Sequence, residues 1–289
     1  MKKSMFSGFN RFCRDLGVPA AVEYARLLGF EGVEPYPGAG FETTQDAETL
    51  GRLLQDAGLC APCVSKAVNL NGPAGDEAVA DLKALADMTA AVGAPQLHHT
   101  LASGLRSAPV GAPTFESAFG DVVRRAREVA DYCAQLGLRV IYEDQGFLFN
   151  GVERFDRFLN AVDRDNIGVC ADFGNIFFVG ETPEHFIGAF SERIFHVHVK
   201  DYLYKPGSAP FLGKSWLRTR DGGYLRDTIP GHGIVDMVSC LYILRKAGYD
   251  GFYSFEFGGP DPYDTGIRQA IENLEYYETL AAHAADSGR

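Results

Sequence analysis

The stretch Leu28–Glu34, which reads LGFEGVE, decides the fold because it joins a helical pattern to a strand pattern through a glycine turn. The stretch Ala247–Phe252 (AGYDGF) repeats the same turn far along the chain. Glycine supplies the left-handed exit that helices favour, and Gly58 and Gly137 occupy the same position after two other helical patterns. These turns predict a repeating unit of one strand and one helix.

Short apolar runs alternate with longer amphipathic runs along the chain, which is typical of a parallel sheet wrapped by helices. The predicted strands number about eight, as in a barrel, and are Met5–Phe9, Gly32–Pro35, Cys60–Val64, Pro95–His99, Leu138–Glu143, Ile167–Ala171, Ile194–Lys200 and Gly251–Glu256. The predicted helices include Pro19–Leu28, Thr44–Ala57, Asp76–Val92, Thr114–Leu136, Val152–Val162, Val235–Ala247 and Asp264–His283.

We therefore expect residues 1–289 to form a single (β/α)₈ TIM-barrel domain, because no linker rich in Pro, Gly or Ser divides the series. A doubly wound open sheet is the main alternative. That fold predicts a glycine-rich phosphate turn after the first strand, but Ser7–Phe12 reads SGFNRF and a P-loop is also absent from the sequence. We expect no nucleotide cofactor.

The composition is that of an ordinary globular protein, with 46% hydrophobic and 22% charged residues. Lysine and arginine number 27 against 38 acidic residues, and the resulting formal charge of −11 argues against a nucleic-acid or anionic-membrane partner. The sequence shows no signal-peptide pattern and no run of the roughly 18 apolar residues that a membrane span requires. The six cysteines are scattered through apolar segments. We expect a cytoplasmic protein.

The connection 201–234 after the seventh predicted strand is much longer than the others, and long ordered loops are usually functional. It contains the single tryptophan, Trp216, together with Arg218, Arg220 and Arg226. This mixture suits either a lid over a polar ligand or an interface with a neighbouring subunit, and we favour the lid. Arg226 is a candidate substrate contact, and a homo-oligomer is expected.

Acidic and imidazole side chains stand at the ends of the last four predicted strands, where such a barrel gathers its catalytic groups. Three carboxylates in a poorly hydrated site cannot all stay ionised without a compensating charge, so a divalent cation is predicted there. Three oxygen ligands and one imidazole suit Mn²⁺, Mg²⁺ or Co²⁺ better than a structural zinc. Taken singly, each acid also fits a helix cap or an ion pair. The four candidates are Glu143, Asp172, His198 and Glu256.

Four motifs occur in order along the second half of the chain: Asp172–Asn175 (DFGN), His196–Asp201 (HVHVKD), Gly231–Asp236 (GHGIVD) and Gly248–Gly251 (GYDG). Together they resemble the xylose-isomerase-like TIM-barrel superfamily of sugar (phosphate) isomerases and epimerases. This superfamily also contains inosose dehydratase, ketose 3-epimerases, endonuclease IV and the catalytic subunits of C-glycoside deglycosidases. The resemblance implies one bound divalent metal, preferably Mn²⁺, with four ligands: Glu143, Asp172, His198 and Glu256.

The chemistry that such a site suits is proton abstraction next to the carbonyl of a keto sugar, sugar derivative or cyclitol, through a metal-stabilised enediolate. Glu143 and Glu256 are expected as the acid and base, with His196 or His98 as the alternative base. Return of the proton to the same carbon gives epimerisation, and transfer to the neighbouring carbon gives isomerisation. Loss of a leaving group gives a lyase instead.

Three departures from the superfamily pattern restrict the reaction. Many relatives have a histidine where Asn175 stands, so Asn175 is expected at most to bind a sugar hydroxyl. Ketose 3-epimerases carry an arginine where Tyr202–Tyr204 reads YLY, which puts that activity in doubt. Endonuclease IV uses further histidines to hold three metals, and their absence together with the negative charge disfavours DNA repair.

Other polar strand-end residues have two interpretations each. His98 is predicted to contact the substrate or to be a packed histidine bonded to backbone, and at most one of His98 and His99 should face the barrel interior. Lys200 is predicted to neutralise an oxyanion or to pair with Asp201. Glu34 is predicted to bind a sugar hydroxyl or to form an ion pair with a loop residue.

Four phenylalanines follow the fifth and sixth predicted strands: Phe147, Phe149, Phe177 and Phe178. This aromatic group is predicted either to bury against a lid or neighbouring subunit, or to stack on an aryl aglycone. The second interpretation favours a lyase, either a deglycosidase acting on 3-keto glycosides with a small partner subunit or an inosose-type dehydratase. A noncatalytic sugar-binding protein is a third, weaker hypothesis, since it would not need paired glutamates.

Overall fold

The computed structural model describes residues 1–102, 111–209 and 213–287. The strands of its large sheet are β1 (Lys2–Met5), β2 (Gly32–Val33), β3 (Val64–Lys66), β4 (Gln96–His99), β5 (Arg139–Glu143), β6 (Ile167–Asp172), β7 (Ile194–Val199) and β11 (Phe252–Phe255). Its helices are α1 (Ser7–Leu16), α2 (Val18–Leu27), α3 (Thr44–Asp56), α4 (Gly75–Ala91), α5 (Phe115–Gln135), α6 (Val152–Val162), η1 (Asn175–Val179), α7 (Pro183–Phe190), η2 (Ser191–Arg193), α8 (Met237–Lys246) and α9 (Tyr263–Asp286).

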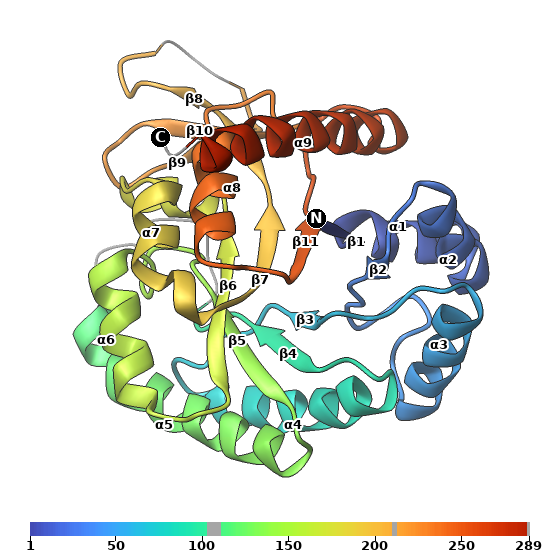
Figure 1. Ribbon diagram of the computed structural model, residues 1–289. Helices are drawn as coiled ribbons and strands as arrows, with labels where there is room; N and C mark the ends of the chain where they lie inside the picture. The colour runs from blue at the N-terminus through green and yellow to red at the C-terminus, as the bar shows by residue number, and fades with distance from the viewer. Residues whose placement is uncertain (103–110, 210–212, 288–289) are drawn as a thin grey trace.

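The eight strands are parallel to their neighbours and follow the order β2-β1-β11-β7-β6-β5-β4-β3. A bridge between Gly32 and Cys60 joins β2 to the segment just before β3, so the two ends of the sheet meet. The helices lie outside this curled sheet (Figure 1). The predicted TIM-barrel fold is confirmed.

Local signals in the sequence explain where the long helix α5 begins and ends. Oγ1 of Thr114 accepts from the backbone N–H of Ser117, and the Ser117 hydroxyl oxygen accepts from the N–H of Thr114 in return. This reciprocal cap satisfies donors that the first helical turn leaves free. At the other end Gly137 has φ of 72°, the left-handed conformation expected of a glycine that follows a helix.

The barrel interior is closed below the site by a small apolar cluster. It consists of Cys63, Ile141 and Cys170, with Phe195 packed against them. A Cβ on Gly168 would lie 2.1 Å from the ring of Phe195, so the strand can pass this ring only as glycine. Because side chains alternate along a strand, Ile141 in this floor directs Glu143 to the same interior, one layer higher.

The first strand was predicted too far along the chain. Residues Lys2–Met5, and not Met5–Phe9, pair with β11, and a helix begins at Ser7. The reason is the spacing of Phe9 and Cys13, which are buried on one face of α1 as residues four apart on a helix are. The helix α7, which begins with Pro183, is a further element beyond those predicted.

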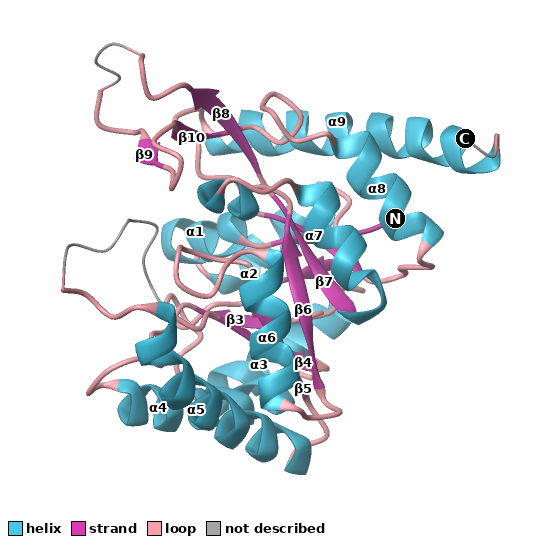
Figure 2. Ribbon diagram, turned by 90° about the vertical axis from the view of Figure 1, so that its left-hand side faces the viewer, coloured by secondary structure: helices cyan, strands magenta, loops and turns pink. Residues whose placement is uncertain are grey.

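The segment 201–234 is not simply a loop, because it contains a small antiparallel sheet of β8 (Asp201–Lys205), β9 (Leu217–Arg218) and β10 (Tyr224–Thr228). Residues 210–212 of this segment lie outside the described residues. Figure 2 shows the small sheet projecting beyond the barrel strands. Its base packs on the barrel through Phe178, Tyr202 and Leu225, with Phe147, Phe177 and Leu217 beside them. The chain's own segment thus covers much of the predicted aromatic group.

None of the helices in the described residues is both long enough and apolar enough to cross a membrane.

Candidate metal centre

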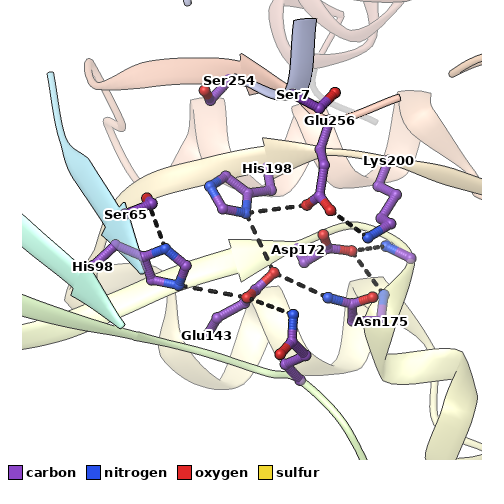
Figure 3. A network of polar contacts seen from close by, with 12 residues as sticks. Ser7, Ser65, His98, Glu143, Asp172, Asn175, His198, Lys200, Ser254 and Glu256 are labelled. Atoms are coloured by element: carbon purple, nitrogen blue, oxygen red, sulfur yellow. Dashed lines mark hydrogen bonds and ion pairs between the residues drawn. The ribbon is translucent and has the colours of Figure 1, made fainter. Parts of the chain in front are cut away.

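The four predicted metal ligands come together at the carboxyl ends of four neighbouring strands. Glu143, Asp172 and His198 end or lie in β5, β6 and β7, and Glu256 follows β11 directly. Each offers one ligand-type atom, and these atoms lie within 4.8 Å of one another. Figure 3 shows the four side chains converging. Three of them are buried, while the Glu256 side chain is 20% exposed and so gives access from the barrel mouth.

The imidazole of His198 lies between the two glutamates. Its Nδ1 is 3.2 Å from Oε1 of Glu143 and 3.5 Å from Oε2 of Glu256. Burial raises the pKa of Glu143, but hydrogen bonds and charges from His198 and His98 outweigh burial and hold that pKa below its usual range. Glu143 is therefore ionised, as a metal ligand or a base must be.

Asp172 has one satisfied and one unsatisfied carboxylate oxygen. Oδ1 accepts from the backbone N–H groups of Gly174 and Asn175, at 2.7 Å each. Oδ2 is buried and has no hydrogen-bond partner among the described residues. Burial, with the negative charges of Glu256 and Glu143, raises the pKa of Asp172 well above its usual value. A buried carboxylate oxygen without a donor is costly unless a cation pairs with it, so these residues fit a divalent metal.

Lys200 pairs with Glu256 and not with Asp201. Its Nζ lies 2.6 Å from Oε1 of Glu256, and its side chain is only 8% exposed. Burial lowers the pKa of Lys200, but Glu256 and other nearby acidic groups outweigh it, so the pKa is raised and Lys200 remains a cation. Asp201 instead accepts from four backbone N–H groups, those of Tyr202, Gly231, Gly233 and Val235.

Asn175 and His98 both lie against Glu143. Nδ2 of Asn175 donates to Oε1 of Glu143 at 2.9 Å, and Nε2 of His98 is 3.4 Å from Oε2. His99 is directed elsewhere, since its Nδ1 contacts the carbonyl oxygen of Thr100 at 2.9 Å. One histidine of the pair therefore faces the cluster, as alternation along β4 predicts.

Two predicted substrate contacts lie outside the four-residue cluster. His196 is fully buried, and its Nε2 contacts Oε2 of Glu34 at 2.8 Å. Arg226 lies on β10, where its guanidinium carbon is 5.2 Å from the centre of the Trp216 ring. Contact of either residue with a substrate stays a prediction.

The sequence interpretation understated Glu34. This residue follows β2, is completely buried, and contacts both His196 and His198. Within the described residues it also belongs to two further groups of ligand-type atoms, one with Cys63 and His196 and one with His98 and His198. The available signal was its place at a strand end, which gave an ion pair as one of two interpretations.

Comparison with known proteins agrees with the barrel fold. The family described as xylose isomerase-like TIM barrel matches residues 22–277. An inosose dehydratase from Geobacillus thermodenitrificans (strain NG80-2) is 28% identical over 151 residues, which cover 50% of this chain and 50% of that protein. The chain thus spans about half the length of the curated relatives it matches.

Two solved structures show the same fold. D-psicose 3-epimerase with D-tagatose, from Clostridium cellulolyticum H10, has a TM-score of 0.76 at 17% identity and covers 96% of this chain and 99% of its own. A xylose isomerase-like TIM barrel protein from Mycobacterium smegmatis, in complex with magnesium, has a TM-score of 0.70 at 19% identity and covers 92% and 89%. With most of its length matched by the family, this chain belongs to the xylose isomerase-like TIM barrel family.

Proposed function

We propose that the chain is a divalent-metal-dependent isomerase or epimerase that removes a proton next to the carbonyl of a keto sugar, sugar derivative or cyclitol. The observation that carries this proposal is the convergence of Glu143 and Glu256 on Nδ1 of His198, at 3.2 and 3.5 Å from two different strands. Two carboxylates beside one ligand position can remove a proton and return it elsewhere. A protein that only bound a sugar would need neither to be a base.

Four residues would hold the cation: Glu143, Asp172, His198 and Glu256. When bound, a divalent cation supplies positive charge to the carbonyl oxygen as the proton leaves the neighbouring carbon. Mn²⁺, Mg²⁺ and Co²⁺ suit these ligands, and we favour Mn²⁺.

The remaining polar groups support a polyhydroxylated substrate. His98 and Lys200 each direct a nitrogen to a glutamate of the cluster, and Asn175 holds the carboxylate of Glu143 with its side-chain amide. The relatives named inosose dehydratase and D-psicose 3-epimerase also concern carbonyl compounds of this class. These side chains would bind a single hydroxyl of the substrate only weakly. Several substrate hydroxyls bound at once fix the orientation of the carbon that loses its proton.

A dehydratase is the second candidate, and Lys200 favours it. Elimination of water needs an acid that protonates the departing hydroxyl, whereas epimerisation does not. The ammonium of Lys200 is a buried hydrogen-bond donor 2.6 Å from Glu256, beside the cluster, and we assign it the contact with the leaving hydroxyl. The curated inosose dehydratase relatives support the same reaction class.

The experiment that tests both candidates is deuterium incorporation from D₂O, followed by mass spectrometry, with ketoses, inososes and 3-keto glycosides. Mn²⁺-loaded protein should exchange a carbon-bound hydrogen, and protein in EDTA should not. A product that gains deuterium and keeps its oxygen count identifies the isomerase or epimerase, and a product that loses water identifies the dehydratase. Protein that binds Mn²⁺ yet exchanges no hydrogen in any of these substrates would contradict the proposed function.

A further inference from the structure

Glu34 accepts four side-chain hydrogen bonds in the middle of the barrel. Oε1 contacts the hydroxyl of Ser65 and, at 3.0 Å, Nε2 of His198. Oε2 contacts Nε2 of His196 at 2.8 Å and the hydroxyl of Ser254 at 2.5 Å. A carboxylate has about four acceptor positions, so these contacts use all of them and leave no room for a proton on Glu34 itself.

This saturation decides where the hydrogens of two histidines lie. A carboxylate only accepts hydrogen bonds, so each histidine nitrogen that faces Glu34 must carry the hydrogen. His198 and His196 therefore both carry it on Nε2. For His198 the consequence is direct, because Nδ1 is then free to offer its lone pair to a cation held with Glu143 and Glu256.

The same carboxylate acts on His98 through Ser65. A serine hydroxyl has one hydrogen, and Ser65 directs it to Glu34. The oxygen of Ser65 must then accept from Nδ1 of His98, which lies 2.9 Å away. Ser65 thus links Glu34 to the ring of His98, whose Nε2 lies 3.4 Å from Oε2 of Glu143.

We propose that Glu34 is the positioning residue of this centre, holding His198 as a metal ligand through Nδ1 and fixing the ring of His98 beside Glu143 through Ser65. The inference rests on the proposed metal centre. Glu34 is not one of the four residues that would hold the cation with Glu143 and Glu256. It acts through two imidazoles, in the way that carboxylates behind metal-bound histidines fix ring orientation.

A glutamine at position 34 breaks this arrangement with almost no change of shape. Its amide has one acceptor oxygen and one donor nitrogen, so one of the two histidines meets an N–H group and cannot keep its hydrogen on Nε2. If that histidine is His198, its hydrogen moves to Nδ1 and blocks the lone pair needed for the metal. If it is His196, His198 keeps its contact with the amide oxygen, but a neutral amide is a weaker acceptor than a carboxylate and holds the ring less firmly.

The test compares Glu34→Gln with Ser254→Ala, using Co²⁺ absorption and Mn²⁺ calorimetry to measure metal affinity. Glu34→Gln should weaken metal binding by roughly 10- to 100-fold, the usual effect of losing such a partner. Ser254→Ala removes one hydrogen bond to the same carboxylate but leaves both histidine contacts, so its affinity should stay within about threefold of the wild type. Equal weakening in the two variants, or unchanged affinity in folded Glu34→Gln, would overturn the proposal.

A second measurement needs no substitution. Long-range ¹H–¹⁵N spectra of the Zn²⁺-loaded wild-type protein report which nitrogen of each histidine carries hydrogen. His198 and His196 should carry it on Nε2 and His98 on Nδ1. Hydrogen on Nδ1 of His198 in the loaded protein, or no hydrogen on Nδ1 of His98, would contradict the inference even if Glu34→Gln did not fold.

Failure of this inference differs from failure of the proposed function. Wild-type protein that binds no divalent metal would remove the metal centre itself. Wild-type protein that binds metal and exchanges deuterium, while Glu34→Gln binds equally well, would leave the function standing and reject only the role of Glu34.

Discussion

The side-chain amide of Asn175 donates to Oε1 of Glu143 at 2.9 Å, and this contact links the candidate metal centre to the segment 201–234. The oxygen of the same amide accepts from the hydroxyl of Tyr202, the second residue of β8, at 3.0 Å. The small sheet is therefore linked to the carboxylate of Glu143 through one buried amide. A histidine at this position, as in the superfamily pattern, would be a titratable group. The amide of Asn175 is neutral at every pH.

Replacing the amide should impair catalysis more than it impairs folding. Asn175→Leu removes a buried hydrogen bond to a charged group, worth about 1.5–3 kcal/mol, so kcat/KM should fall roughly 10- to 150-fold. Tyr202→Phe is the matched control, because it spares the contact with Glu143. Steady-state kinetics with circular dichroism checks this, and equal losses in both variants would contradict a direct role for the amide.

The paired glutamates should be indispensable for turnover. Glu143→Gln and Glu256→Gln keep the side-chain shape but remove the base, so each should lower the rate of deuterium exchange by about 10²- to 10⁴-fold while the thermal transition stays cooperative. His198→Ala should act differently, by weakening metal binding. Exchange at the wild-type rate in either glutamine variant would reject the assigned roles.

Metal binding should stabilise the fold. Because a bound cation would satisfy the unpartnered Oδ2 of Asp172, Mn²⁺ at a hundred times its dissociation constant should add about 2.7 kcal/mol to the free energy of unfolding. EDTA should remove this gain. In Asp172→Asn the gain at the same Mn²⁺ concentration should be clearly smaller, and an undiminished gain would place the metal elsewhere.

Acid should destabilise the protein in part through His99. Burial lowers the pKa of His99 to about 4, from 6.5 when exposed, and its Nε2 has no hydrogen-bond partner in the described part of the chain. The unfolded chain thus binds a proton more readily, so this stability is complete above pH 6.5 and is lost as pH falls toward 4. The loss is roughly 2 kcal/mol at pH 5.

Urea unfolding in EDTA at pH 7.5 and pH 5 measures this loss. His99→Phe retains a ring against Tyr142, whose ring centre lies 5.1 Å from that of His99, but cannot be protonated. The fall in unfolding free energy between the two pH values should therefore be smaller in the variant. An equal fall in both proteins would assign the acid sensitivity to other groups.

Asp201 should control how readily a protease cleaves the segment 201–234. Its carboxylate accepts from backbone N–H groups at both ends of that segment, so Asp201→Asn loses about half of these contacts when one oxygen becomes a donor. Trypsin should then cleave after the exposed Lys214 sooner than in the wild type, with the barrel left intact. Mass spectrometry of early fragments checks this, and unchanged cleavage would mean that packing alone holds the segment.

The grouping of the candidate metal ligands could be predicted from the sequence because parallel strands end at the same rim of the barrel. Glu143, Asp172 and Glu256 needed only strand assignments to be placed together, and their convergence follows from the barrel. The position of β1 could not be found in this way. Residues 2–9 contain only three large apolar side chains, Met5, Phe6 and Phe9, and the pairing with β11 far along the chain shows where the strand ends.

Contacts between side chains that lie far apart in the chain also could not be predicted from the sequence. Glu34 accepts a hydrogen bond from Ser254, which lies 220 residues later, and no local sequence pattern indicates that pair. The sheet of β8 and β10 shows the same limit, since Arg226 and Leu203 are neighbours only through its antiparallel register. Residues that act through others are recognised by their partners, and the partners come from the fold.

The place of β11 between β1 and β7 has a consequence for synthesis on the ribosome. β1 leaves the exit tunnel long before its second neighbour, β11, is synthesised. Until then the nascent chain carries open strand edges, which invite pairing with other chains. A cation held by Glu143, Asp172, His198 and Glu256 would likewise have its full set of ligands only after Glu256 is synthesised.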